Sequence, residues 1–316
     1  MPNLPEKILL AMPRGYCAGV DRAVQSVERA LAIYGAPVYV RKEIVHNQHV
    51  VARLRELGAV FVESEQDIPE GATAVFSAHG VAPAVRLNAQ ARGLNVIDAT
   101  CPLVTKVHRE ALRFAADGYT IVMIGHAGHE EVDGTIGEAP DRIVLVEHEQ
   151  EVRDLEVADP NRVAYISQTT LSVDETRDVI MALRKRFPAI IGPRTDDICY
   201  ATTNRQAAVK QLASLCDLVI VIGSRNSSNS NRLVEVVREA GTAAQLIDNA
   251  SQLQDGWLEN VAVLGISSGA SAPEELVTEL VEVFRGRGVR EIAELEVVHE
   301  DTRFMLPAPV RHVVPA

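Results

Sequence analysis

Apolar runs and amphipathic segments alternate along almost the whole of this chain. Eight runs are typical of strands: 8–12, 37–45, 73–78, 95–98, 119–125, 162–167, 217–223 and 261–267. Most are apolar at consecutive positions, as in strands that are buried on both faces. The segments between them place apolar residues at helical spacing, and several end in glycine. We therefore predict an α/β protein with parallel sheets covered by helices.

Length and composition limit the classes of protein to which this chain can belong. A single core stops growing near roughly 250 to 300 residues, so 316 residues predict two or three compact parts. The net charge of −12 disfavours binding to nucleic acid or to an anionic membrane. No run approaches the roughly 18 continuous apolar residues of a membrane span, and the first residues lack the features of a signal peptide. We expect a cytoplasmic protein.

Polar residues follow the predicted strands at nearly every junction with the next helix. The junction sequences are GYCAG, VHNQH, HGVAP, ATCPLV, HAGHEEVDG, QTTLS, SRNSSNSN and SGASAP, and CYATTN precedes a helix without so clear a strand before it. Parallel sheets bind ligands beyond the carboxyl ends of their strands, where helix N-termini also point. The junctions are therefore the expected functional residues.

The spacing of these junctions suggests three copies of one α/β unit. His46 and His79 lie 29 and 62 residues after Cys17, His129 and Thr169 lie 28 and 68 residues after Cys101, and Ser227 and Ser271 lie 28 and 72 residues after Cys199. We predict three thirds, 1–99, 100–196 and 197–300, followed by a C-terminal tail, 301–316. With their ligand-binding ends facing a common centre, the thirds would bring three thiols together.

Three of the four cysteines are candidate metal ligands. Cys17, Cys101 and Cys199 lie in polar or glycine-rich loops before helices, and none belongs to the local cysteine pairs that are typical of structural zinc sites. Three thiolates on a four-iron cluster leave one iron open to a substrate oxygen, which indicates a catalytic cluster. Cys216 precedes an apolar run and is predicted to be a small buried hydrophobe.

Histidine, hydroxyl and amide side chains at the other junctions indicate an anion-binding site. At a single junction such a residue is more typical of a helix cap, but their recurrence at equivalent positions favours a cradle for phosphate or diphosphate. The candidates are His46, His79, His129, Thr169, Thr170, Ser227, Ser228, Asn229 and Ser271. Arg14, beside the first cysteine loop, is interpreted as a surface charge.

Glu131 is the candidate proton carrier. It follows His129 by two residues, and exclusion of water from a cavity raises the pKa of a carboxyl group into a useful range. Glu130 and Glu138 are interpreted as part of a solvated acidic face.

A hydrolase is an alternative interpretation of one short motif. The sequence GISSG at 265–269 matches the nucleophile elbow, with Ser267 as the nucleophile. Asp301 and His312 complete the required order only through the proline-containing tail, which we expect to be poorly ordered. Motifs of this length often arise by chance, so a hydrolase is disfavoured.

Taken together, the junction motifs resemble the LytB family of 4-hydroxy-3-methylbut-2-enyl diphosphate reductases. The motifs are RGYCAGVDRAV, EIVHN, SAHGV, DATCPLVTKVH, GHAGHEEVDGT, SQTTLS, CYATTNRQ, GSRNSSNSNRL and GASAPE. They run from about residue 8 to about residue 283, and the segment after 284 adds little to the resemblance.

The resemblance implies a trefoil of three α/β units related by a pseudo-threefold axis around one 4Fe-4S cluster per chain. It implies cluster ligation by Cys17, Cys101 and Cys199. It assigns diphosphate contacts to His46, His79, His129, Ser227, Ser228, Asn229 and Ser271. Glu131 and Thr169, with Gln168 adjacent, are assigned to the substrate hydroxyl and its protons, and His129 is counted with them as catalytic.

The implied reaction removes the allylic hydroxyl of (E)-4-hydroxy-3-methylbut-2-enyl diphosphate reductively, using two electrons and two protons. The products are isopentenyl and dimethylallyl diphosphates, at the last step of the methylerythritol phosphate pathway. Because the sequence contains no dinucleotide fingerprint, the resemblance implies an external electron donor such as ferredoxin or flavodoxin.

Two alternatives remain open at this point. Another three-cysteine 4Fe-4S enzyme, of the dehydratase or quinolinate-synthase type, would use the same ligand set. A non-enzymatic iron-sulfur sensor would need a basic surface or a nucleic-acid motif, and the sequence shows neither.

Overall fold

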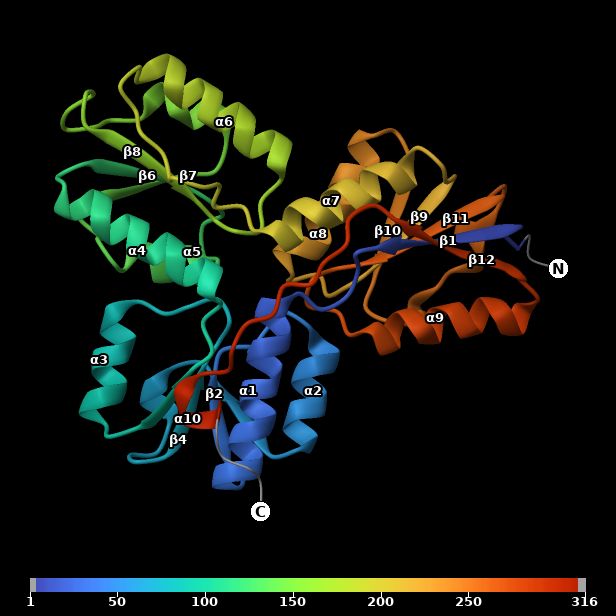
Figure 1. Ribbon diagram of the computed structural model, residues 1–316, viewed down its shortest axis with the longest axis horizontal. Helices are drawn as coiled ribbons and strands as arrows, with labels where there is room; N and C mark the ends of the chain where they lie inside the picture. Colours follow the sequence, from blue (N-terminus) through green and yellow to red (C-terminus); the bar gives the residue numbers. More distant parts are fainter. Residues whose placement is uncertain (1–3, 312–316) are drawn as a thin grey trace. The chain divides into compact units, whose positions relative to one another are not determined.

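The computed structural model describes residues 4–311 and divides into two compact units (Figure 1). Unit 1 comprises residues up to Val20, His46–Ala52 and Tyr200–Arg303. Unit 2 comprises Asp21–Val45, Arg53–Cys199 and the residues from Phe304 onward. Within 4–311 no helix combines the length and the apolar character needed to cross a membrane.

Unit 1 is built on one parallel sheet of five strands in the order β10-β9-β11-β1-β12. The strands are β1 (Lys7–Met12), β9 (Leu218–Ile222), β10 (Ala243–Ile247), β11 (Val263–Ser268) and β12 (Glu291–Glu296). The helices of this unit are α7 (Tyr200–Ala213), α8 (Ser228–Glu239) and α9 (Glu274–Arg287), with short 3₁₀ turns at Ala250–Gln252 and Asp255–Leu258.

Both faces of this sheet are covered, as its continuous apolar runs predict. On one face Ile8, Leu10 and Ile220 belong to the same core cluster as residues of α9, including Leu280 and Phe284. On the other face Leu9, Ala11 and Val219 share a cluster with Val209 and Leu212 of α7 and Leu233 and Val237 of α8. Each fully buried aliphatic side chain contributes about 1.5–3 kcal/mol through removal from water.

Unit 2 contains two parallel sheets, in the orders β3-β2-β4-β5 and β7-β6-β8. The strands are β2 (Val38–Arg41), β3 (Ala59–Val62), β4 (Thr73–Phe76), β5 (Asn95–Asp98), β6 (Thr120–Ile124), β7 (Ile143–Val146) and β8 (Val163–Ser167). The helices are α3 (Pro83–Ala91), α4 (Pro102–Ala116), α5 (Glu130–Ile136), α6 (Val173–Arg186) and α10 (Ala308–Arg311), with 3₁₀ turns at Glu65–Asp67 and Glu149–Asp154. Helices α1 (Ala18–Tyr34) and α2 (Gln48–Glu56) begin in residues of unit 1 and continue into unit 2.

The three-stranded sheet of unit 2 is likewise covered on both faces, as Figure 1 shows for α6 and α4. Val122 and Ile124 share a core cluster with Val179 and Leu183 of α6. Ile121 and Met123 share one with Val107 and Phe114 of α4 and with Val132 of α5. The packing of α5 against this face brings the residues around Glu131 to the end of the sheet.

The parallel α/β class is confirmed, and all eight predicted strands are present, although the run 37–45 forms a strand only over Val38–Arg41. Four further strands, β3, β7, β10 and β12, lie at sheet edges. The three sheets agree with a three-unit architecture. The boundaries of the thirds stay a prediction. One strand belongs to a different sheet than these boundaries imply: β1, from the predicted first third, pairs with β11 and β12 of the predicted last third.

The described part of the tail is ordered, contrary to expectation. Val310 of α10 is fully buried, and the Arg22 guanidinium donates a hydrogen bond to the Met305 carbonyl (2.8 Å). His312, the third member of the hydrolase alternative, lies outside the described residues. Ser267 is fully buried within strand β11 rather than exposed at a strand-to-helix turn, so the nucleophile-elbow interpretation is wrong.

Candidate functional site

Cys17 lies directly before helix α1, in the loop that follows β1. The loop turns at Gly15, whose φ of +70° favours glycine, and the Gly15 amide donates to Ser268 Oγ (2.8 Å). The Cys17 amide donates to the Ala270 carbonyl (3.2 Å), and the Val20 amide points at the Cys17 sulfur (3.5 Å). The sulfur of Cys17 therefore lies at a helix N-terminus, within reach of a backbone N–H donor.

The loop after β11 connects Cys17 to the predicted diphosphate contacts of unit 1. The Ala270 amide donates to Asn229 Oδ1 (2.8 Å), and the Ser271 hydroxyl donates to the His46 carbonyl (2.9 Å). Asn229 and Ser271 are both buried. Cys17, His46, Asn229 and Ser271 are therefore linked through two consecutive residues of one loop.

Ser227 and Ser228 lie at the start of α8. The Ser227 hydroxyl caps the helix by accepting the Ser230 amide (3.3 Å), and it also contacts the Ser230 hydroxyl (3.0 Å). Ser228 is the first residue of α8 and is partly exposed. This 12-residue helix begins at the same end of the sheet, and the free amides of a helix N-terminus are suited to binding an anion.

Cys101 and Cys199 belong to unit 2, and backbone hydrogen bonds place each beside another predicted residue. Cys101 is the N-cap residue of α4, and its amide donates to the carbonyl of Ala78, the neighbour of His79 (2.9 Å). The Cys199 amide donates to the Thr169 carbonyl (3.0 Å). Like Cys17, both cysteines are partly exposed at the start of a helix.

Glu131 and Thr169 form a buried pair beside Cys199. The Glu131 carboxylate accepts the Thr169 amide at Oε1 (2.6 Å) and the Thr169 hydroxyl at Oε2 (3.0 Å). The two residues are 2% and 5% exposed, so the carboxylate is withdrawn from bulk water. Thr170 lies next in the chain, and its hydroxyl accepts a hydrogen bond from the buried Gln168 amide group (3.0 Å).

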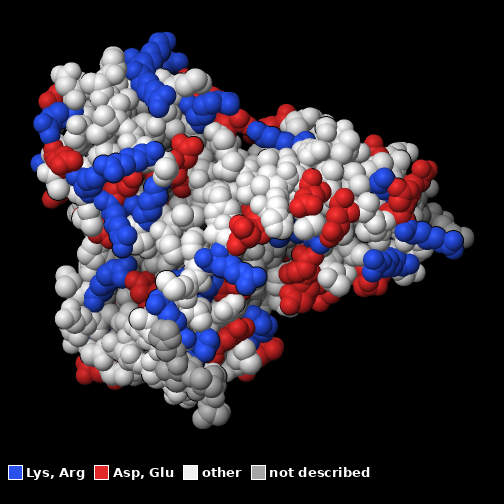
Figure 2. All heavy atoms as spheres, viewed as in Figure 1, with Lys and Arg blue, Asp and Glu red and all other residues white. Residues whose placement is uncertain are grey.

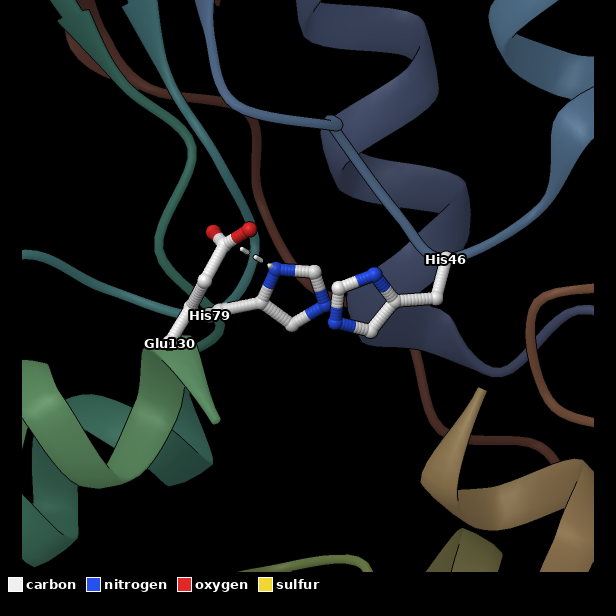
Figure 3. A group of neighbouring side chains, drawn as sticks. All are labelled: His46, His79 and Glu130. Carbon is white, nitrogen blue, oxygen red and sulfur yellow. Dashed lines mark ion pairs between the residues drawn. The ribbon is translucent and has the colours of Figure 1, made fainter. Parts of the chain in front are cut away.

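His79, His129 and Glu130 form a second group close to this pair. His129 caps α5 by accepting the Glu131 amide at Nδ1 (3.2 Å), and its ring meets that of His79 edge to face, with centroids 5.8 Å apart. His79 Nδ1 lies 3.4 Å from Glu130 Oε2, and Figure 3 shows the imidazole and the carboxylate pointing toward each other.

The interpretation of Glu130 and Glu138 as a solvated face is wrong. Glu130 pairs with His79, while Glu138 lies 2.8 Å from Nδ1 of the buried His108 and is only 10% exposed. Both lie on or just after α5, which packs inward against α4. The surface-charge interpretation of Arg14 is also wrong: its side chain is 11% exposed and pairs with Glu274 and Glu294.

Several residues around the cysteines gave no signal in the sequence. Asp197 is buried, and its carboxylate accepts hydrogen bonds from the Ser167 amide (3.0 Å) and the Lys106 ammonium (3.1 Å). Burial raises the pKa of Asp197 to about 6, although these two hydrogen bonds act to lower it. Tyr200, which follows Cys199, accepts the Ala18 amide (3.2 Å), and burial raises the pKa of Tyr200 to about 12. Each depends on a partner distant in sequence, which no local pattern reveals.

The donor set fits an iron-sulfur cluster. Three partly exposed thiols stand at helix N-termini, whereas Cys216 is 9% exposed among the apolar residues of α7 and the sheet, as predicted. Burial raises the pKa of the Cys216 thiol to about 12, and the neighbouring Asp217 acts in the same direction. Such a thiol is a poor metal ligand. The structure thus separates the three candidates from the fourth cysteine.

Comparison with known proteins identifies the family. The family model described as "LytB protein" matches residues 8–285. The 4-hydroxy-3-methylbut-2-enyl diphosphate reductases of Acidothermus cellulolyticus and Neisseria meningitidis are 56% and 57% identical, covering 100% and 96% of this chain and 93% and 95% of their own. The solved E-1-hydroxy-2-methyl-but-2-enyl-4-diphosphate reductase of Plasmodium falciparum is 37% identical, with a TM-score of 0.95 over 98% of both chains. The chain therefore belongs to the LytB family.

Proposed function

We propose that this protein is a 4-hydroxy-3-methylbut-2-enyl diphosphate reductase that converts its substrate to isopentenyl and dimethylallyl diphosphates. The observation that carries this function is the buried Glu131–Thr169 pair, hydrogen-bonded to the backbone beside Cys199. With Glu131 as the proton carrier and Cys199 as a metal ligand, this pair would supply the proton that a reductive dehydroxylation requires.

Cys17, Cys101 and Cys199 would hold one 4Fe-4S cluster, with the three predicted thirds arranged as a trefoil around it. When bound, such a cluster supplies electrons and an open iron site for the substrate hydroxyl. The helix N-termini behind the cysteines offset part of its negative charge. Electrons would come from an external donor such as ferredoxin or flavodoxin, and we place the reaction in the cytoplasm.

The diphosphate would be held by the polar side chains at the strand ends. Those of unit 1 are His46, Ser227, Ser228, Asn229 and Ser271, and those of unit 2 are His79, His129 and Thr170. Hydroxyl and amide donors stabilise an anion locally even though the net charge of the chain is −12.

Glu131 would deliver the proton that accompanies cleavage of the C–O bond. The substrate hydroxyl leaves as water when it gains a proton, while two electrons and a second proton convert the allylic carbon framework to the alkene product. The Thr169 hydroxyl donates to Glu131 Oε2, and it would orient the substrate hydroxyl toward this carboxyl group. His129 holds the amide of Glu131 and so fixes the start of α5.

Replacement of Glu131 by Gln tests this role. We expect anaerobically purified Glu131→Gln to retain the iron and sulfide content of the wild type but to lose at least about a hundredfold in turnover, the usual scale of general acid catalysis. The exposed Glu156 provides a matched control, Glu156→Gln, which should keep full turnover. Near-normal turnover in Glu131→Gln with an intact cluster would refute the proton-donor role.

Spectroscopy of the cluster separates this enzyme from the two alternatives. A branched allylic diphosphate should perturb the cluster spectrum, whereas a hydroxy acid or a dicarboxylate should not. The reverse pattern would indicate an enzyme of the dehydratase or quinolinate-synthase type. A cluster that responds to none of these compounds and supports no turnover would indicate a sensor.

A further inference from the structure

Arg205 of α7 is a completely buried cation in unit 1. Its Nη1 donates to both carboxylate oxygens of Glu300 (3.1 and 3.2 Å) and to the Ala201 carbonyl (3.1 Å). Its Nη2 donates to the carbonyl of Gly15 (2.8 Å). A buried guanidinium is costly unless paired, so these contacts must persist together for Arg205 to stay where it is.

The Gly15 carbonyl belongs to the loop that presents Cys17. The Arg205 side chain donates a hydrogen bond to the Gly15 carbonyl, and the Gly15 amide donates one to Ser268 Oγ. On the other side of Cys17, the Ala18 amide donates to the Tyr200 hydroxyl, which also belongs to α7. Helix α7 therefore contacts the backbone both before and after Cys17.

The segment that ends unit 1 holds the same loop from a second direction. The Val297 amide donates to the Met12 carbonyl (3.0 Å), and Glu294 of β12 pairs with Arg14 (3.2 Å). Figure 2 shows acidic and basic side chains together over the region of α9 and β12. Glu300 lies three residues after Val297, and its carboxylate accepts hydrogen bonds from the side chains of Asn204 and Arg205. Residues 294–300 thus connect the first cysteine loop to α7.

We propose that Arg205 and Glu300 form a positioning pair that fixes the Cys17 loop in the geometry required for cluster binding. Glu300 holds the guanidinium, and the guanidinium holds Gly15 two residues before the thiol. Lysine cannot replace arginine here. The two Nη atoms of a planar guanidinium reach a carboxylate and two carbonyls at once, whereas the single nitrogen of an ammonium group does not. Because the pair acts on a predicted cluster ligand, its importance for catalysis rests on the function proposed above.

The test compares Glu300→Gln and Arg205→Lys with wild type, all as full chains. As a control, Arg285→Lys and Glu282→Gln alter an exposed ion pair in α9 of the same unit. For the cluster-bound proteins we expect several-fold faster iron loss to a chelator in the first two variants and a rate equal to wild type in the control variants. We also expect a shifted electron paramagnetic resonance signal in the first two.

A second measurement does not depend on a bound cluster. In cluster-free protein, alkylation by iodoacetamide followed by peptide mass spectrometry gives the labelling rate of each cysteine. We expect Cys17 to react several-fold faster in Glu300→Gln, while the rate at Cys101, on a different helix of unit 2, stays unchanged.

Unchanged labelling of Cys17 in Glu300→Gln would overturn the positioning role, whatever the cluster content. Equal acceleration at Cys17 and Cys101 would also overturn it, because it would indicate general loosening. Glu300 is 14% exposed at its side chain, so Glu300→Gln decides the question even if Arg205→Lys fails to fold. A wild-type protein that binds no cluster would instead refute the proposed function. The labelling rates would still decide whether Arg205 and Glu300 position the Cys17 loop, because they are measured without a cluster.

Discussion

At the scale of single residues, the four cysteines differ in burial and therefore in reactivity. Burial raises the pKa of Cys216 to about 12, so this thiol stays protonated at pH 8. Cys17, Cys101 and Cys199 are partly exposed at helix N-termini.

We expect iodoacetamide at pH 8 to modify these three in folded, cluster-free protein while Cys216 remains unmodified. Peptide mass spectrometry over a time course measures the four rates, and unfolded protein in urea serves as the control in which all four react. Rapid labelling of Cys216 in the folded protein would contradict the prediction.

The residues predicted from the sequence are those whose chemistry is unusual for their local context. A cysteine in a glycine-rich loop or a run such as SRNSSNSN is conspicuous without a structure. Arg205 and Lys106 are not conspicuous in the sequence, because an arginine or lysine within a helical pattern normally faces solvent. Their function depends on partners roughly 90 or more residues away, and only the folded chain shows that these partners meet.

At the scale of elements, helix α5 positions Glu131, and its packing depends on a missing side chain. A Cβ at Gly137, the residue that follows α5, would lie 2.4 Å from the Cβ of Ala82, which precedes α3. Backbone would have to move to relieve this contact, and overpacking of this kind costs about 1–3 kcal/mol.

We therefore expect Gly137→Ala to lower the free energy of unfolding by about 1–3 kcal/mol and to reduce turnover by displacing Glu131. Gly286→Ala is the matched control, because a Cβ added at Gly286 of α9 would meet no described atom within 4 Å outside the adjacent residues and the neighbouring backbone of its own helix. That substitution should be neutral or should stabilise by about 0.5–1 kcal/mol. Urea unfolding and turnover measure both effects, and equal results for the two variants would show that α5 tolerates the displacement.

Element prediction succeeded for the central strands but missed four edge strands, β3, β7, β10 and β12, although it found the edge strands β5 and β8. The central strands β6, β9 and β11 are buried on both faces and therefore form continuous apolar runs. The edge strand β12, with the sequence EIAELE, has no fully buried residue and carries charge at every second or third position. Helix α5 cannot be predicted from periodicity for a different reason, since its seven residues are too few to establish a helical period.

At the scale of the whole molecule, acid stability depends in part on carboxylates that are hydrogen-bonded in the folded state. Burial alone would raise the pKa of Asp98, but hydrogen bonds from Thr100 and Arg86 outweigh it and lower the pKa below the usual 3.8. A lowered folded-state pKa contributes stability above the unfolded pKa, and this contribution is lost as pH falls through the folded value.

We expect the free energy of unfolding of cluster-free protein to decrease as pH falls below about 4, and to decrease less in Asp98→Asn. Urea unfolding at pH 7 and at pH 3.5 measures this difference. Asp255→Asn, which removes an exposed partner of Arg287, is the control and should keep the pH dependence of wild type. An identical decrease in Asp98→Asn and wild type would show that Asp98 does not contribute.

The division into two compact units has a consequence for how the molecule unfolds. Each unit has its own sheet cores, and the proposed ligands are divided between them, with Cys17 in unit 1 and Cys101 and Cys199 in unit 2. A ligand that binds only the folded state stabilises whatever must be folded to bind it. A cluster held by cysteines of both units would therefore couple their unfolding.

We expect calorimetry of the cluster-free protein to resolve two transitions, and the cluster-bound protein to unfold in one transition at higher temperature. Cys17→Ser should retain the two-transition behaviour under conditions of cluster assembly, because unit 1 then lacks its ligand, whereas Cys216→Ser should behave as wild type. Two transitions in iron-loaded protein, with only one of them shifted to higher temperature, would mean that the cluster is bound within one unit, and would remove Cys17 from the proposed ligand set.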